Sequence, residues 1–260
     1  MKIAIVGCGW LGFPLAKTLI KNDYTVIGST TSTDKIAILQ NNGIQPILWN
    51  LGDKFENNLL QEIDVLVINI PPSKTKNAAF SYSNSLIQFC KNIHIKTKVI
   101  FVSTTGVYPD NLENASSSVP FNSMDQTKET VLAEIKLKEL LENRITILRL
   151  AGLIGPSRHP ITSLSKKGIV SNGNAPLNLI HLNDVIGIIH SIIENKFWGE
   201  IVNGCFPEHP SKKEYYQKAA AYFKLEPPQF LEGGDNMKIV NSKSRLNYKY
   251  TTSIYEFDKI

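Results

Sequence analysis

The sequence predicts an α/β protein with a doubly wound parallel sheet. Three observations predict it: strand-like and helix-like stretches alternate over the first 150 residues, the strand-like stretches are apolar throughout, and a glycine-rich turn follows the first of them. Parallel strands are covered by helices on both faces, so they appear as continuous apolar runs. The 260 residues suffice for one large domain, or for one domain with a small addition, at about 100–200 residues per domain.

The predicted elements follow from local patterns in chain order. Apolar runs predict strands, which are Lys2–Val6, Tyr24–Gly28, Ile47–Trp49, Val65–Ile70, Lys98–Ser103 and Ile145–Leu150. Between these strands, apolar residues three and four positions apart predict helices. The predicted helices are Leu11–Ile20, Lys35–Gln40, Ser85–Lys91 and Val131–Leu141. We expect Asp34 to cap the second of these helices, because its carboxylate can accept from a free N–H.

After residue 150 the sequence becomes richer in glycine, proline and short polar loops. Short strands are predicted at Asn178–His181 and Glu200–Asn203. Asp184 is expected to cap a helix with a strongly apolar face, and Ser211 to cap a second helix. No linker separates this part from the first 150 residues, so we expect the two parts to pack together.

The composition excludes several classes of protein. Hydrophobic residues make up 42% and charged residues 20%, as in ordinary globular proteins. Runs such as Ile3–Val6 are far shorter than the ~18 residues of a membrane span, and the first residues do not read as a secretory signal. The net charge is +5 with scattered lysines, so we expect neither a nucleic-acid nor a membrane partner. The cysteines Cys8, Cys90 and Cys205 show no disulfide or metal-ligand spacing, which is typical of a reduced cytoplasmic protein.

The turn after the first strand reads Gly-Cys-Gly-Trp-Leu-Gly, a G-x-G-x-x-G motif over residues 7–12. Gly7 permits the tight turn, Gly9 lets the backbone approach a pyrophosphate, and Gly12 lets the helix pack closely on the strand. Free N–H groups at the helix start favour phosphate charge. We therefore expect a Rossmann-type dinucleotide site that also includes Trp10 and Leu11; the alternative is a tight turn without a ligand.

The end of the second strand bears on which dinucleotide is bound. NAD sites usually carry an acidic residue there to hold the ribose hydroxyls, whereas this strand runs into Ser29-Thr30-Thr31-Ser32-Thr33. Thr30, Thr31 and Lys35 would tolerate a 2′-phosphate, so the cofactor is NAD or NADP, with a slight preference for NADP. Pro71, after the fourth strand, and Thr104, at the end of the fifth, complete the expected cofactor contacts. We accordingly expect a nucleotide-binding domain over 1–150 and a small substrate-side region over 151–260.

Four segments together resemble those of a known superfamily. They are FVSTTGVY at 101–108, LRLAGLIGP at 148–156, NLIHLNDV at 178–185 and IVNG at 201–204. Their order and sequence are similar to those of the extended short-chain dehydrogenases/reductases, the NAD-dependent epimerase/dehydratase superfamily. The glycine motif and the segment RLAGLIGPSRHP at 149–160 resemble most closely an atypical bacterial branch, the YeeZ-type group.

The resemblance implies hydride chemistry that uses a Ser or Thr, a Tyr and a Lys. Thr104, four residues before Tyr108, matches the Ser/Thr that hydrogen-bonds the substrate oxygen. The usual Tyr-x-x-x-Lys pair is absent. If Lys128 is the lysine, Met124 replaces the tyrosine, and methionine cannot transfer a proton.

A second register of the same segment leaves the pair equally incomplete. If Glu134 sets the register, Gln126 and Thr130 occupy the two positions. We name Thr104, Lys128 and Tyr108 as catalytic candidates, with Tyr108 as a surrogate acid; the alternatives are that Tyr108 is a packed residue and Lys128 a solvated one.

Polar residues after the sixth strand complete the predicted site. Arg158 and His159 follow it at the carboxyl edge of the sheet, where ligands bind in open α/β folds, and are the candidates for substrate binding. Arg149, inside an apolar strand, is expected to pair with a buried carboxylate or with carbonyl groups. His181 is expected to orient the loop before Asp184. No residue cluster has metal-ligand spacing.

Two functions remain open at the level of the sequence. The first is an NAD(P)-dependent oxidoreductase or epimerase-like enzyme that acts on a small or nucleotide-linked substrate. The second is a non-catalytic module that binds NAD(P) and reports its redox state or occupancy to a partner. The superfamily resemblance also implies a homodimer formed through long helices.

Overall fold

The computed structural model describes residues 1–54, 62–72, 81–233 and 237–258. Its largest sheet has seven parallel strands in the order β3-β2-β1-β4-β5-β6-β10. The strands are β1 (Lys2–Val6), β2 (Thr25–Thr30), β3 (Gln45–Leu48), β4 (Val65–Ile68), β5 (Lys98–Thr104), β6 (Ile145–Leu150) and β10 (Ile201–Gly204). The strand order reverses between β1 and β4, which is where open α/β sheets form a ligand-binding crevice.

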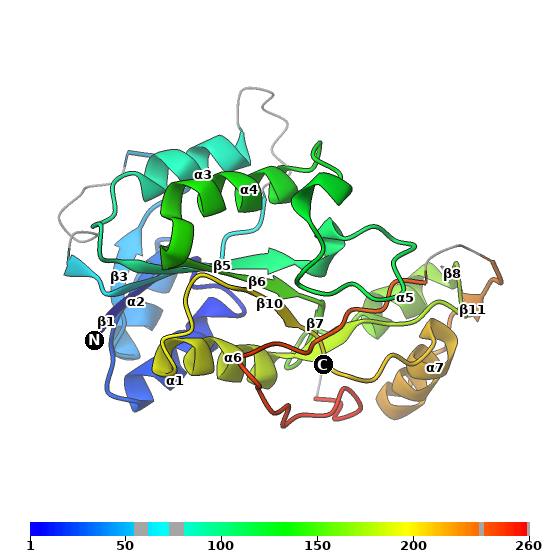
Figure 1. Ribbon diagram of the computed structural model, residues 1–260. Helices are drawn as coiled ribbons and strands as arrows, with labels where there is room; N and C mark the ends of the chain where they lie inside the picture. The colour runs from blue at the N-terminus through cyan, green and yellow to red at the C-terminus, as the bar shows by residue number, and fades with distance from the viewer. Residues whose placement is uncertain (55–61, 73–80, 234–236, 259–260) are drawn as a thin grey trace.

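Helices cover both faces of this sheet (Figure 1). One face carries α1 (Gly12–Lys21), α2 (Asp34–Asn41) and α6 (Leu182–Glu194), and the other carries α3 (Tyr82–Cys90) and α4 (Glu129–Leu141). Each layer has its own apolar core, with Leu15 and Ile189 on the first face and Leu86 and Leu137 on the second. The predicted doubly wound α/β fold is therefore confirmed.

The remaining elements lie beyond the carboxyl ends of β5 and β6 (Figure 1). They are β7 (Gly152–Ile154), α5 (Ile161–Lys167), β8 (Ile169–Val170), β9 (Leu179–His181), α7 (Lys212–Phe223) and β11 (Gln229–Phe230). All of them except β8 contribute to a third apolar cluster that includes Ile161 and Tyr215. Strand β10 and helix α6 come from the same half of the chain but belong to the main sheet and its covering layer.

The final segment, residues 237–258, runs back across the molecule toward α6 (Figure 1). Its main anchor is the buried carboxylate of Asp184, which accepts hydrogen bonds from the Tyr248 hydroxyl and from Thr251 and Thr252. A second anchor is Asn178, whose side chain accepts from the backbone N–H of Val240 at 2.8 Å. The segment also reaches the first 150 residues, because the backbone N–H of Ala115 donates to the carbonyl of Ile239 at 2.8 Å, so it joins the two parts of the chain.

Three expectations about elements need correction. Neither expected aspartate is a cap: Thr33 precedes α2 with Asp34 in the first turn, and His181 caps α6 by accepting from the N–H of Asn183. Asp184 instead holds the final segment. The third strand begins at Gln45, before the predicted start, because backbone pairing with β2 sets its bounds. Ser211 does cap α7, by accepting from the N–H of Glu214.

Candidate functional site

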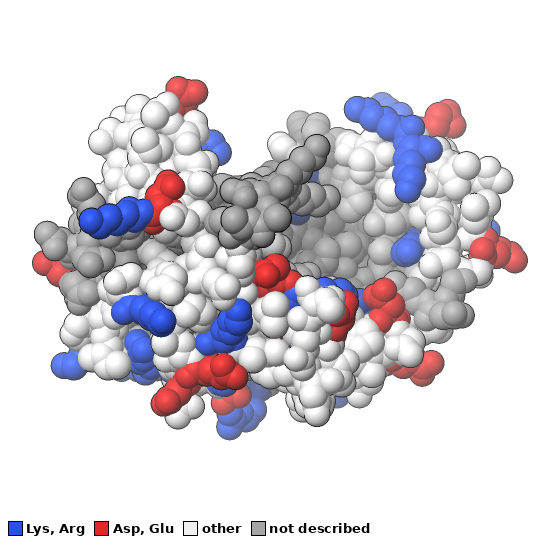
Figure 2. Space-filling model, turned by 90° about the horizontal axis from the view of Figure 1, so that it is seen from above, with Lys and Arg blue, Asp and Glu red and all other residues white. Residues whose placement is uncertain are grey.

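A cleft of about 680 Å³ opens at the carboxyl ends of the central strands. This volume lies within the ~300–1,000 Å³ of small-molecule sites. Seen from above, the surface is hollowed between the part that carries α3 and α4 and the part that carries α5 and α7 (Figure 2). The described residues that line the cleft are Gly7–Leu11, Ser29–Thr31, Lys35, Trp49–Leu51, Asn69–Pro72, Tyr82, Phe101–Thr105, Thr130, Leu150–Leu153 and Arg158.

The glycine loop is fixed to two neighbouring strands. Gly7 has a φ of 101°, and a Cβ there would overlap the carbonyl oxygen of Asn69. The backbone N–H of Gly7 donates to the Ser29 hydroxyl at 3.0 Å, and the N–H of Cys8 donates to the Ser29 carbonyl at 2.9 Å. The Asn69 side chain donates to the carbonyl of Gly7 at 3.1 Å. The loop is therefore held rigidly at the end of β1.

Gly9 and Gly12 occupy different environments within this loop. A Cβ on Gly9 would have no atom within 4 Å among the described residues, and Gly9 lines the cleft. A Cβ on Gly12 would overlap the carbonyl of Gly7, and Gly12 lies in the helix rather than at the cleft. Gly9 thus keeps space for a ligand and Gly12 allows close packing, so the loop fits a dinucleotide pyrophosphate.

The end of β2 supplies one side of the cleft. Thr30, Thr31 and Lys35, which were expected to contact the cofactor, line the cleft together with Pro71 from the loop after β4. Cys8 also lies here, and burial raises the pKa of its thiol to about 12, offset only in part by the Lys35 charge. A thiol that stays protonated is a poor nucleophile, which agrees with a packing role for Cys8.

The end of β5 supplies the hydroxyl groups of the site. Thr104 lines the cleft, and its Oγ1 accepts from the N–H of Gly106 at 3.1 Å. Because the oxygen accepts there, its own proton can be donated into the cleft. Thr130, in the first turn of α4, brings a second hydroxyl to the same cleft.

The two registers considered for the Tyr-x-x-x-Lys segment can now be compared. Met124 is buried and Lys128 precedes α4, where its amine donates to the carbonyl of Gly106 at 3.3 Å; neither lines the cleft. Gln126 is exposed, and Thr130 is the residue of this segment that reaches the cleft. This arrangement favours the register set by Glu134, in which Thr130 occupies the lysine position.

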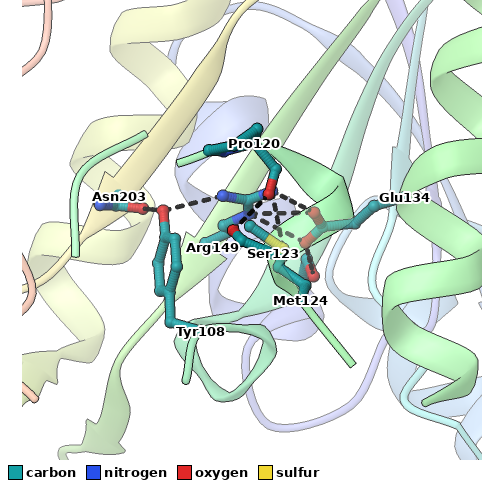
Figure 3. Close-up of polar contacts among 8 residues, drawn as sticks. Tyr108, Pro120, Ser123, Met124, Glu134, Arg149 and Asn203 are labelled. Carbon is teal, nitrogen blue, oxygen red and sulfur yellow. Dashed lines mark hydrogen bonds and ion pairs between the residues drawn. The ribbon is translucent and has the colours of Figure 1, made fainter. Parts of the chain in front are cut away.

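Tyr108 lies in a buried polar network and not among the residues that line the cleft (Figure 3). Its hydroxyl donates to Asn203 Oδ1 and accepts from Arg149 Nη1, both at 2.8 Å. The Arg149 guanidinium also donates to Glu134 from Nη2 at 2.6 Å and from Nε at 3.0 Å. Burial raises the pKa of Tyr108, although Arg149 opposes part of this shift. Tyr108 is thus held in the core by its partners.

The Arg149–Glu134 ion pair confirms that Arg149 has a buried carboxylate partner, since both side chains are 0% exposed. Burial lowers the pKa of the guanidinium, but the hydrogen bonds and charge of Glu134 more than offset this effect, so the net shift is upward. Glu134 also accepts from the hydroxyl of Ser103, a residue at the cleft. The network therefore supports the strand end that carries Thr104.

Tyr82 is the tyrosine that the described residues bring to the cleft, and the sequence did not indicate it. Its hydroxyl donates to the carbonyl of Ile70 at 2.7 Å. Burial, more than the nearby charges, raises the pKa of this phenol. Tyr82 therefore supports the loop after β4 rather than offering a free phenol.

The two substrate-binding candidates are separated by the structure. Arg158 lines the cleft, with its guanidinium 4.9 Å from the centre of the Trp10 ring. His159 is buried away from the lining, between the N–H of Ile161 and the hydroxyl of Tyr215. Burial lowers the pKa of His159 to about 4, so the ring is neutral near pH 7. His159 holds the aromatic core of the C-terminal part.

Sequence reasoning missed several lining residues besides Tyr82 and Thr130. Ser29 and Asn69 hold the glycine loop, and both are polar residues at the end of an apolar strand, a signal that could have identified them. Trp49, Asn50 and Leu51 come from the loop after β3 and carried no motif.

No group of three or more potential metal ligands occurs among the described residues. None of the described helices is both long enough and apolar enough to cross a membrane.

Comparison with known proteins shows what the sequence and the fold of this chain are similar to. Residues 2–119 match the model of the NAD-binding domain of 6-phosphogluconate dehydrogenase. The fold is similar to the UDP-glucuronic acid 4-epimerase of Bacillus cereus, solved with NAD, at a TM-score of 0.77 and 24% identity over 98% of this chain and 95% of that one. It is also similar to the UDP-glucose 4-epimerase of Thermotoga maritima, at a TM-score of 0.74 and 17% identity over 98% and 96%. The chain therefore shares its fold with these two epimerases.

By sequence the chain belongs to the YeeZ family. It is 34% identical to the protein YeeZ of Escherichia coli (strain K12) over 263 residues, which cover 96% of this chain and 95% of that protein. The resemblance to the YeeZ-type group expected from the sequence motifs is therefore confirmed.

Proposed function

We propose that the protein binds NAD or NADP in the cleft and uses it as an oxidoreductase or epimerase-like enzyme. The observation that carries the proposal is the division of roles in the glycine loop. Gly7 supplies the left-handed turn, Gly9 faces open space, and Gly12 packs on the carbonyl of Gly7. These are the three demands that a bound pyrophosphate makes of this motif.

The choice between the two dinucleotides depends on the end of β2. No acidic residue is among the described residues that line the cleft, whereas Lys35 lines it beside Thr30 and Thr31. A carboxylate would repel a 2′-phosphate and a lysine attracts one, so this wall supports binding of NADP as well as NAD. The NAD complex of the Bacillus cereus relative supports NAD. We expect both to bind, with NADP at least as tightly.

When bound, the nicotinamide would exchange a hydride with a carbonyl or alcohol carbon of the substrate. Thr104 is placed to donate its hydroxyl proton to the carbonyl oxygen, because its Oγ1 already accepts from Gly106. Lys128 steadies the same turn through the carbonyl of Gly106. In place of the missing tyrosine, the Thr104 hydroxyl would pass a proton from water to the substrate oxygen.

The activity is tested by following oxidation of NADH and NADPH with a panel of aldehydes, ketones and UDP-sugars. Thr104→Ala should lower kcat roughly 10²-fold, as loss of one positioned donor does elsewhere, and Thr104→Ser should recover most of it. Lys128→Ala should cost less, about tenfold or below, because its amine acts through the backbone. The exposed Lys21→Ala serves as the unaffected control.

A second function is favoured by one observation. The phenols of Tyr108 and Tyr82 are both occupied by protein partners, so neither described tyrosine offers a free acid to the cleft. The alternative is therefore a non-catalytic module that binds NAD(P) and reports its redox state or occupancy to a partner. Tight NADH binding with no turnover of any panel member would select this function.

We also propose a cellular compartment for the protein, from the state of its cysteines. Cys8, Cys90 and Cys205 are all free and buried. Burial raises the pKa of the Cys90 thiol to about 12, with a smaller opposing effect of Arg144. Free thiols are normal where glutathione and thioredoxin keep cysteine reduced, so we place the protein in the cytoplasm.

A further inference from the structure

We propose that Arg158, stacked on Trp10, anchors a phosphate or carboxylate group at the junction of the glycine loop and the loop after β7. This inference rests on the proposed function in that it names the chemistry of one ligand group in the same cleft. The cleft carries two described charged side chains, Lys35 and Arg158, and both are positive. A concave site with cations and no described acid favours an anionic ligand.

Arg158 is free to take such a ligand. Among the residues that the structure describes, no side chain forms an ion pair or hydrogen bond with its guanidinium. By contrast, the guanidinium groups of Arg149 and Arg144 both have protein partners. A guanidinium offers a planar fork of donors that matches two oxygens of a phosphate or carboxylate. Arg158 therefore has unused donors at the edge of the cleft.

The loop that carries Arg158 is fixed to the glycine loop. The N–H of Gly155 donates to the Arg158 carbonyl at 3.1 Å, and the N–H of Arg158 donates back to Gly155 at 3.0 Å. Between them Ser157 adopts a φ of 57°. The Trp10 indole N–H donates to the carbonyl of Pro156 at 2.8 Å. Trp10 thus contacts this loop with both its N–H and its ring.

This arrangement pre-orders the cation. Stacking on Trp10 restricts the long arginine side chain before a ligand arrives, so less conformational entropy is lost on binding. Trp10 belongs to the glycine loop and Arg158 to the loop after β7, so a bound anion would lie where these two loops meet. The anion has two possible sources, the diphosphate of the dinucleotide and an acidic group of the substrate, and both offer the same chemistry.

The test measures binding to Arg158→Ala, Arg158→Lys and the control Lys21→Ala. Nicotinamide fluorescence gives the Kd of NADH, and calorimetry gives those of UDP and citrate, with and without saturating NADH. Arg158→Ala should weaken at least one of these ligands about 10- to 100-fold, the cost of a lost charge-assisted contact. Arg158→Lys keeps the charge without the fork and should recover part of the loss, and Lys21→Ala should match the wild type.

The pattern of losses identifies the source of the anion. Weaker NADH binding assigns Arg158 to the dinucleotide diphosphate. Weaker UDP or citrate binding in the presence of NADH, at unchanged NADH affinity, assigns it to the substrate. Equal affinities of Arg158→Ala and wild type for all three ligands, or a wild type that binds none of them, would overturn the inference. Wild type that binds UDP or citrate but not NADH would reject the proposed function and leave Arg158 testable with those two probes.

Discussion

At the scale of single residues, Arg149 shows how a charge inside an apolar strand is accommodated. The sequence required a buried partner but could not name it, because the choice depends on how α4 packs on β6. The structure selects Glu134, and Tyr108 joins the pair from a turn 41 residues away from Arg149. The segment 101–108 could therefore predict the strand and Thr104 but not the direction in which Tyr108 points.

Glu134→Gln should be strongly destabilising. The substitution leaves Arg149 as a buried charge without its carboxylate, which typically costs about 3–5 kcal/mol. Urea denaturation of wild type and variant measures the difference. The double variant Glu134→Leu/Arg149→Met removes both charges and should recover much of the lost stability. If the unfolding free energy of Glu134→Gln lies within about 1 kcal/mol of wild type, which is about fivefold in the unfolding constant, the account is contradicted.

His159 should make stability depend on pH. The folded-state pKa is about 4 and the unfolded-state value about 6.5. Below pH 6.5 the unfolded chain takes up a proton that the folded chain does not, so stability falls as the pH drops from about 6.5 to about 4, by roughly 3 kcal/mol at most. Urea denaturation at several pH values in this window should show a shallower slope for His159→Gln; equal slopes would argue against a neutral buried ring.

At the scale of elements, the two aspartates expected as caps show where local patterns fail. An aspartate before an apolar helical face predicts a cap, yet α2 begins at Asp34 itself, without a side-chain cap on Thr33, and α6 begins two residues before Asp184. Asp184 is taken by the final segment, more than 60 residues later in the chain. Pairing over such a distance has no local signal.

Asp184→Ala and Asp34→Ala should therefore differ clearly in stability. The first removes a buried carboxylate that accepts from Tyr248, Thr251 and Thr252, and hydrogen bonds to a charged group contribute about 1.5–3 kcal/mol each. We expect a loss of at least ~2 kcal/mol for Asp184→Ala and below ~1 kcal/mol for Asp34→Ala, which only loses a favourable helix-dipole contact. Thermal unfolding compares them, and similar losses would refute the anchoring role of Asp184.

At the scale of the whole molecule, the sequence predicts those features that depend on apolar strands and on the glycine loop. Apolar runs predicted six strands of the main sheet, and the glycine motif predicted where the cleft opens. The seventh strand, β10, was expected only as a short strand of the C-terminal half, because four residues carry no sign of which sheet edge they join. His159 follows Arg158 directly, but the turn of the loop puts only Arg158 at the cleft.

The central claim is that this cleft binds a dinucleotide through the glycine loop, and Gly9 tests it most directly. A Cβ added at Gly9 would meet no described atom within 4 Å, so we expect Gly9→Glu to fold normally while its carboxylate occupies the space reserved for the pyrophosphate. NADH and NADPH are titrated into wild type and Gly9→Glu, with nicotinamide fluorescence as the readout and thermal unfolding as the check on folding. The account predicts saturable binding to wild type and none to Gly9→Glu at an unchanged Tm. Equal binding to the two proteins, or no binding to wild type, would contradict it.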